Sequence, residues 1–139
     1  MKKTLRNVEI ENILSIIGNP SSFRNNVSVK VPVAVDYAVR VNLKKLNERF
    51  EIFNEMRSDI QREFLEAGKV NEEKTSISDE YISEYNSRYI PLALQANEFD
   101  FQPINKEDFE HMELSMPERD FLMLMVEDEE VETVEGTVE

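Results

Sequence analysis

His111 is the only histidine of the chain, so any metal or acid–base chemistry that needs an imidazole would run through it. Glu107 lies one helical turn before it, and Asp108 and Glu110 lie beside it. Zinc sites in proteins use three or four protein ligands, commonly histidine and cysteine, and cysteine is absent here. We therefore interpret His111 as a surface residue of an acidic segment and predict no metal site.

Other catalytic patterns are equally weak. Only three glycines occur, at Gly18, Gly68 and Gly136, so the chain has no glycine-rich phosphate loop. No nucleophile motif accompanies the histidine. With 29 acidic residues, pairs of carboxylates that could act as acid and base arise by chance. We predict that the protein is not an enzyme and that it binds no cofactor.

The net charge of −13 is concentrated at the C-terminal end. Residues 127–139 hold seven acids and no base, and they begin with the run Glu127, Asp128, Glu129 and Glu130. The rest of the chain has 22 acids against 16 bases. We predict a single domain over residues 1–126 and a flexible acidic tail over residues 127–139. The alternative is a tail that becomes ordered against a basic partner surface.

Partners of several classes are unfavoured by this composition. The only dense basic group comprises Lys2, Lys3 and Arg6, which is too small for the basic face that nucleic acids require. No apolar run is long enough to cross a membrane, and polar residues interrupt any signal-peptide core near the N-terminus. We therefore expect protein partners, with no direct binding of nucleic acid or membrane.

Residues 33–67 predict one long amphipathic helix of roughly 50 Å. Large apolar side chains recur along it at steps of three and four residues, which places them on one face. Arg57 stands in the one gap of this pattern, where the neighbouring Met56 can keep the face apolar. The residues of the face are Leu43, Leu46, Phe50, Phe53, Ile60 and Phe64. We expect them to act first in packing and second in an interface.

A shorter helix is predicted over about residues 78–90, capped by Ser78 and kinked or ended by Pro91. Tyr81, Tyr85 and Tyr89 share one of its faces and are expected to pack antiparallel on the long helix. A row of tyrosines can also form a ligand-stacking surface, but a half-buried seam is the favoured interpretation.

The remaining segments predict short elements. Asn7 is expected to cap a helix that ends before Gly18, and Asn105 is expected to cap a short helix over residues 106–112. Ser115 and Glu118 are expected to form a capping box for a third helix, which runs through Val126. Alternating residues predict a strand at 27–31 paired with one at 98–102, with residues 4–5 as a third strand. Tyr37, Arg40 and Asn42 are expected to form a polar cluster on the long helix. The predicted fold is α+β and mainly helical, with a two- or three-stranded sheet.

Three stretches of the sequence carry a family resemblance. They are T-L-x-N-V-E at residues 4–9, Y-A-x-x-x-N-L-x-x-L at residues 37–46, and an acidic strand ending in Pro-Ile at residues 99–104. This layout resembles a family of small uncharacterised proteins encoded by tailed bacteriophages and prophages. The resemblance implies a phage product in the bacterial cytoplasm or in the virion, and it assigns no functional residues.

These observations favour a non-catalytic protein–protein interaction protein of a bacteriophage, either a virion component or an assembly factor. The long helix would bind other phage proteins or a second copy of the chain. The alternative is an acidic inhibitor of a host protein, which mimics nucleic acid or blocks a basic site. The acidic run at Glu127 is the feature that supports this alternative.

Overall fold

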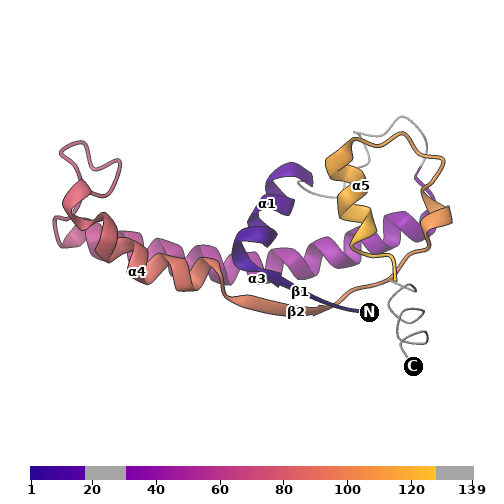
Figure 1. The fold of residues 1–139 in the computed structure, drawn as a ribbon, viewed down its shortest axis with the longest axis horizontal. Coiled ribbons are helices and arrows are strands. Elements are labelled where there is room, and N and C mark those ends of the chain that lie inside the picture. Colours follow the sequence, from indigo (N-terminus) through magenta and orange to yellow (C-terminus); the bar gives the residue numbers. More distant parts are fainter. Residues whose placement is uncertain (18–30, 128–139) are drawn as a thin grey trace, which may run out of the picture.

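The computed structural model describes residues 1–17 and 31–127, and it has one helix that spans the whole length of the molecule (Figure 1). Four helices and a two-stranded sheet within these residues confirm the predicted α+β, mainly helical fold. The strands are β1 (Lys2–Arg6) and β2 (Ala96–Asp100), and the helices are α1 (Asn7–Ile17), α3 (Val33–Glu66), α4 (Ile82–Ala93) and α5 (Met116–Met123).

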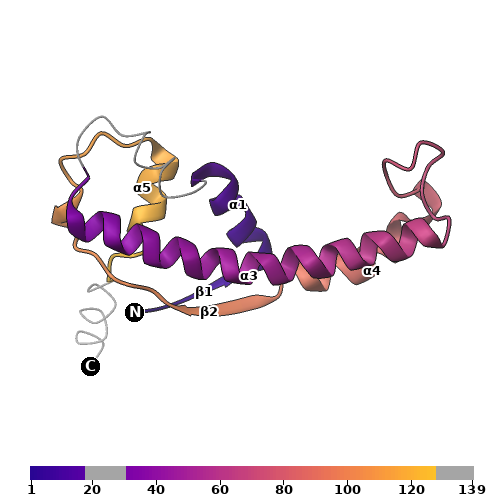
Figure 2. The ribbon, with the colours of Figure 1, turned by 180° about the vertical axis from the view of Figure 1, so that it is seen from behind.

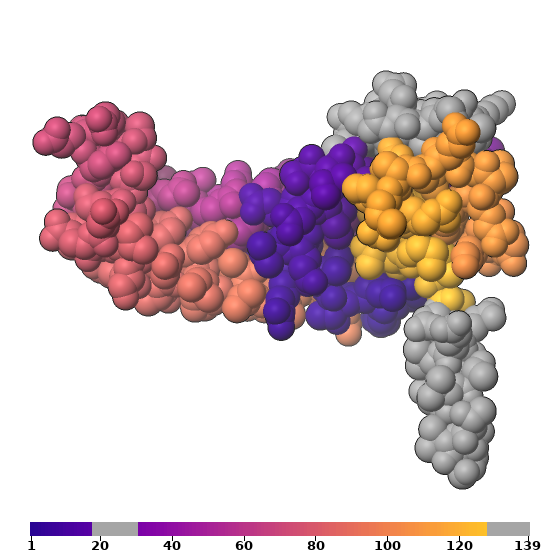
Figure 3. Space-filling view, turned by 45° about the horizontal axis from the view of Figure 1, so that its top comes forward, coloured from indigo at the N-terminus to yellow at the C-terminus, as the bar shows by residue number. Residues whose placement is uncertain are grey.

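The molecule consists of a head and an arm. The head contains α1, α5, both strands and the N-terminal half of α3 (Figure 1). The arm contains the C-terminal half of α3, α4 and the connection between them, and it projects from the head as a narrower body (Figure 3). In the arm, α4 is the element that packs against α3, whereas α1 and the sheet pack on α3 in the head.

Helix α3 matches the predicted long helix closely and spans about 51 Å at 1.5 Å per residue. It ends in a Schellman motif: the amide of Lys69 donates to the carbonyl of Phe64, and the amide of Gly68 donates to that of Leu65. Gly68 has a φ of 73°, a left-handed conformation that glycine adopts at little cost. The predicted end of the helix at this glycine is therefore correct.

The sheet pairs β1 with β2 in antiparallel register, with Lys3 opposite Phe99 and Arg6 opposite Ala96. Residues 4–5, which were predicted as a third strand, therefore pair with β2. The predicted pairing of residues 27–31 with 98–102 falls largely on residues 27–30, which lie outside the described part of the chain, and Val31 has no strand conformation. The register places Leu5 and Phe99 on the buried face, and Lys2 pairs with Glu98 on the exposed face.

The core of the head lies between α1, α5, the sheet and the N-terminal half of α3. Its largest fully buried side chains include Ile10, Leu43, Leu46, Phe109 and Leu122. Helix α5 is held by the predicted capping box, in which Ser115 and Glu118 each bond the other's backbone amide at 3.3 and 2.9 Å. This helix ends at Met123 rather than at Val126, because residue 126 forms a bridge with Ile104.

Two buried asparagines join separate elements of the fold, one within the head and one between the head and the arm. The side chain of Asn42 donates to the carbonyl of Gln102 at 3.0 Å and accepts from its amide at 2.8 Å. The side chain of Asn7 donates to the carbonyl of Leu92 at 2.8 Å, so it links α1 to α4 instead of capping its own helix as predicted. Both side chains are satisfied, as buried polar groups must be.

Three further predictions need correction. Tyr37 and Arg40 are exposed, so they form no polar cluster with Asn42. The short helix predicted over residues 106–112 is a single 3-10 turn, η2 (Lys106–Asp108). Helix α4 continues past Pro91 to Ala93, because the proline lies in its last turn and displaces only one backbone hydrogen bond. A 3-10 turn, η1 (Asp79–Tyr81), leads into this helix from Ser78.

Candidate interaction surface

The predicted packing residues lie in two places. Leu43 and Leu46 are buried in the head, and Phe50 is half-buried against the same core. Phe53, Ile60 and Phe64 are buried in the arm, where the rings of Phe53 and Phe64 contact tyrosines of α4. The structure therefore uses nearly all of the apolar face of α3 inside the chain, which leaves little of it for a partner.

The seam of the arm is aromatic. The rings of Phe53 and Tyr89 lie 6.3 Å apart between centroids, and those of Phe64 and Tyr85 lie 5.4 Å apart in an edge-to-face arrangement. Tyr85 stacks on Tyr89 at 5.8 Å. These distances fall in the range of favourable aromatic pairs. The order of the contacts runs in opposite directions along the two helices, so the predicted antiparallel pairing and the half-buried tyrosine row are both correct.

Arg57 fills the gap in the apolar face of α3. Its guanidinium lies 4.7 Å from the ring centroid of Phe53 and donates to Glu11 on α1 at 2.8 Å. Burial alone would lower the pKa of Arg57, but the hydrogen bond and the charge of Glu11 raise it above its ordinary value. Met56, which was expected to fill this gap, is instead exposed. Sequence periodicity missed this role because it counts arginine as polar, although its planar group stacks on aromatic rings.

Ion pairs fasten the outer part of the arm. Arg88 on α4 donates to both carboxylate oxygens of Glu63 on α3, at 2.8 and 3.2 Å. This hydrogen bond, together with the charge of Arg88, lowers the pKa of Glu63. Lys69 donates to Glu84 at 2.7 Å, and its ammonium lies 5.4 Å from the rings of Phe64 and Tyr81. These contacts close the arm near its tip.

The loop at the tip is ordered by one side chain. The Oδ1 atom of Asn71 accepts from the amides of Thr75 and Ser76, at 2.8 and 3.3 Å. Its Nδ2 atom donates to the hydroxyls of the same two residues. Lys74 at the turn has a positive φ of 61°. The arm therefore presents a defined tip, which rises from its end in Figure 1.

Apolar side chains remain exposed on the flanks of the arm. Ile52 and Met56 lie one turn apart on α3, with 54% and 49% of their surface exposed. They line a groove of about 620 Å³ where the arm meets the head. Arg49, Arg88 and Pro91 also line this groove. Ile90 near the end of α4 and Leu94 directly after this helix are nearly half exposed as well. A groove lined by two exposed apolar side chains is a candidate interaction surface.

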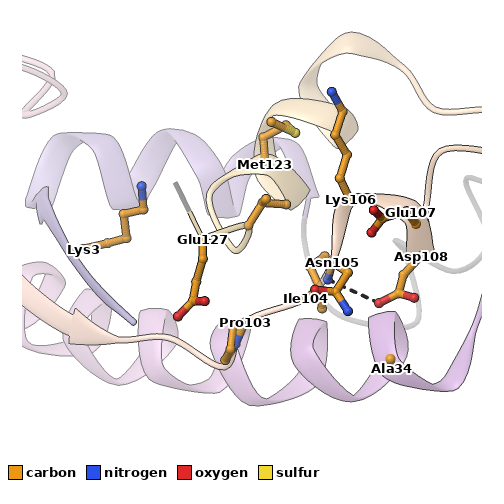
Figure 4. A pocket seen from close by; sticks show the side chains of 11 residues that line it. Lys3, Ala34, Pro103, Ile104, Asn105, Lys106, Glu107, Asp108, Met123 and Glu127 are labelled. Atoms are coloured by element: carbon orange, nitrogen blue, oxygen red, sulfur yellow. Dashed lines mark hydrogen bonds between the residues drawn. The ribbon is translucent and has the colours of Figure 1, made fainter. Parts of the chain in front are cut away.

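A cavity of about 810 Å³ lies in the head beside the start of α3 (Figure 4). Lys3 and Glu127 approach it from one side, and Lys106, Glu107 and Asp108 lie on the other (Figure 4). Asp108 already accepts a hydrogen bond from the backbone amide of Asn105 at 3.2 Å. Charges of both signs line this cavity, so it offers no consistent attraction for a ligand of either charge.

The other residues considered for chemistry are dispersed. His111 is exposed, and among residues 1–17 and 31–127 no group of three potential metal ligands comes together. Glu127 is exposed, whereas Asp128, Glu129 and Glu130 of the predicted acidic run lie outside the described residues. No helix in the described part of the chain is long and apolar enough to cross a membrane.

The comparisons with known proteins add no relative. No protein family, no curated protein and no solved structure matches this chain. Function must therefore be argued from the arrangement of the residues themselves.

Proposed function

We propose that this protein is a non-catalytic interaction protein of a bacteriophage, acting as a virion component or as an assembly factor. The phage context rests on the sequence resemblance described above. The interaction role rests on one structural observation, which is the arm with apolar side chains exposed on its flanks.

The arm supports this role because an isolated pair of helices buries only the seam between them. A chain that needed α3 and α4 only for stability could fold them onto the head, where their outer faces would be covered. Here Ile52 and Met56 remain exposed beside a groove instead. An extended arm with a defined tip is suited to contact another protein at a distance from the head.

Affinity purification from the native phage-infected cell, followed by mass spectrometry, tests the proposal. The wild-type chain is compared with the double variant Ile52→Asp, Met56→Asp and with the control Lys44→Asp, which changes another exposed position of α3. Phage particle proteins that survive a high-salt wash with wild type and control, but are lost with the double variant, are the expected result.

Two other results would count against the proposal. A host protein that washes off with salt would instead support an acidic inhibitor, since screening weakens contacts between exposed charges. Recovery of the same phage proteins with the double variant would show that the arm is not the binding surface.

A further inference from the structure

Strand β1 has one edge that pairs with β2 and one edge that does not. The amide of Asn7, directly after β1, donates to the carbonyl of Gln95 at 3.1 Å, so Asn7 faces β2. Backbone groups alternate in direction along a strand, which turns the amides and carbonyls of Lys2 and Thr4 away from β2. Figure 2 shows the two strands side by side below α3.

Most of this outer edge of β1 is open. At its end, the outward amide of Arg6 donates to the carboxylate of Glu9 at 2.7 Å. In the described part of the chain, nothing bonds the outward amides and carbonyls of Lys2 and Thr4, and both residues are exposed. Exposed backbone groups of this kind invite a further strand, and proteins commonly pair or cover them.

The outer edge of β2 is more occupied. Lys45 of α3 donates to the outward carbonyl of Asp100, and the side chain of Gln95 donates to that of Ala96 at 3.0 Å. A third strand can therefore add to this sheet more readily at β1.

The open edge of β1 is basic. It carries the only dense basic group of the sequence, which comprises Lys2, Lys3 and Arg6. Glu98 faces Lys2 at 3.8 Å, and Asp100 binds the ammonium of Met1 at 2.9 Å. Lys3 and Arg6 form no ion pair within the described residues. A segment that fits this edge should therefore be acidic.

The acidic end of the same chain has a suitable composition and starting point. Residues 128–139, which lie outside the described residues, hold six acids, five β-branched residues and no base. β-Branched residues are enriched in strands. The segment follows Glu127, which lines the same cavity as Lys3 and lies on the same side of it (Figure 4). At about 3.3 Å per residue it can reach about 40 Å, and β1 spans only about 17 Å.

We propose that residues 128–139 bind along the open edge of β1 in the same chain, as a third strand beside Lys2 and Thr4. The contact lies in the head, so it is independent of the role proposed for the arm. It would pair the acidic end of the chain with the chain's own basic strand, and it would shield the edge of β1 from other strands.

Amide hydrogen exchange, measured by NMR at Thr4, tests the proposal. The amide of Thr4 gains a hydrogen bond only if a segment adds to the open edge. The amide of Leu5 faces β2 instead, so its exchange reports whether the sheet itself is intact.

Four variants are compared with the full chain. The first ends at Glu127, and the second is Arg6→Glu. The control Lys44→Glu makes the same charge change at an exposed position of α3. The fourth, Val131→Pro with Val134→Pro, retains every charge of the acidic segment but loses two backbone donors.

Exchange at Thr4 should be about tenfold slower in the full chain and in Lys44→Glu than in the truncated chain, as expected for a segment bound about nine-tenths of the time. Arg6→Glu and the double proline variant should lose most of this protection, whereas Leu5 should remain equally protected in all of the chains. The protection of Thr4 should be the same at about 20 and about 500 μM, because the contact lies within one chain.

Three results would overturn the inference. Equal exchange at Thr4 in the full and truncated chains would show that the edge stays open. Protection that survives in the double proline variant would show that the acidic segment does not pair with β1 as a strand. Protection that increases with protein concentration would assign the contact to the acidic segment of a second copy.

Discussion

Replacement of Asn42 by alanine is the most direct test of how α3 is held to the head. Asn42 is completely buried, and both of its amide atoms bond the backbone of Gln102. Alanine would remove both bonds and leave an amide and a carbonyl of Gln102 without their partners. This residue connects β2 to the segment that leads toward η2, so the loss should affect the whole head.

The magnitude follows from the two backbone groups. An unsatisfied buried donor or acceptor costs about 1–3 kcal/mol, so two of them set an upper range of about 2–6 kcal/mol. Gln102 is itself an exposed residue, so water can reach part of its backbone and the lower part of this range applies. Alanine has a higher helix propensity than asparagine by about 0.6 kcal/mol, which offsets part of this loss. We therefore expect Asn42→Ala to lower the free energy of unfolding by about 2–3 kcal/mol.

Equilibrium unfolding in urea, followed by circular dichroism, measures this change. Asn47→Ala is the matched control, because Asn47 lies on the same helix and donates only to the carbonyl of Leu43, one turn earlier. Its replacement should change the free energy of unfolding by less than about 0.5 kcal/mol. Asn42→Leu separates packing from hydrogen bonding, since leucine fills a similar volume without a polar group.

Two results would refute the reasoning. If Asn42→Ala and Asn47→Ala were equally stable, the bonds to Gln102 would contribute nothing. If Asn42→Leu were as stable as wild type, the cost of the alanine variant would come from an empty cavity rather than from unpaired backbone groups.

Three further predictions concern the arm. Phe53→Ala should lower the free energy of unfolding by about 3–5 kcal/mol in urea titrations, because it empties the aromatic seam; a loss below 1 kcal/mol would contradict the burial of this ring. Gly68→Ala should cost about 1 kcal/mol in the same assay, since its φ is positive and no atom lies near enough to clash with a methyl group; an unchanged stability would mean that the helix ends differently. The lowered pKa of Glu63 means that its pair with Arg88 stabilises the fold at pH values above the ordinary carboxyl pKa of about 4.3, and that this contribution is lost as the pH falls through the lowered value. Arg88→Gln should move the carboxyl titration of Glu63, observed by NMR, up to the ordinary range, and an unchanged titration would rule out this pair in solution.

The elements of the fold could be predicted where periodicity and local signals agree. Apolar residues recur in α3 over several turns, and the helix ends at Gly68, whose positive φ is a conformation that few other residues adopt. The capping box of Ser115 and Glu118 is likewise local, so it marked the start of α5 correctly. Strand pairing depends on contacts distant in the sequence, and alternation at residues 27–31 carried no information about which strand β2 would join.

The arm could be predicted only in part from the sequence. The antiparallel seam followed from two matching apolar faces, Phe53 with Phe64 on one helix and Tyr85 with Tyr89 on the other. The role of Arg57 could not be predicted in this way, because its guanidinium is stabilised there by a hydrogen bond to Glu11, which lies on a different helix. The burial of Asn42 was missed for the same reason, since its partner Gln102 lies 60 residues away.

The pattern of large apolar residues on α3 predicted the first role expected of these side chains, which is packing inside the chain. Strongly apolar side chains such as Phe53 and Phe64 stabilise the fold only if the chain buries them, and α4 does so. Ile52 and Met56 of the same helix remain about half exposed instead, and the charged residues Arg49 and Asp59 lie one turn beyond them on either side. These charges keep the exposed part of the helix hydrated.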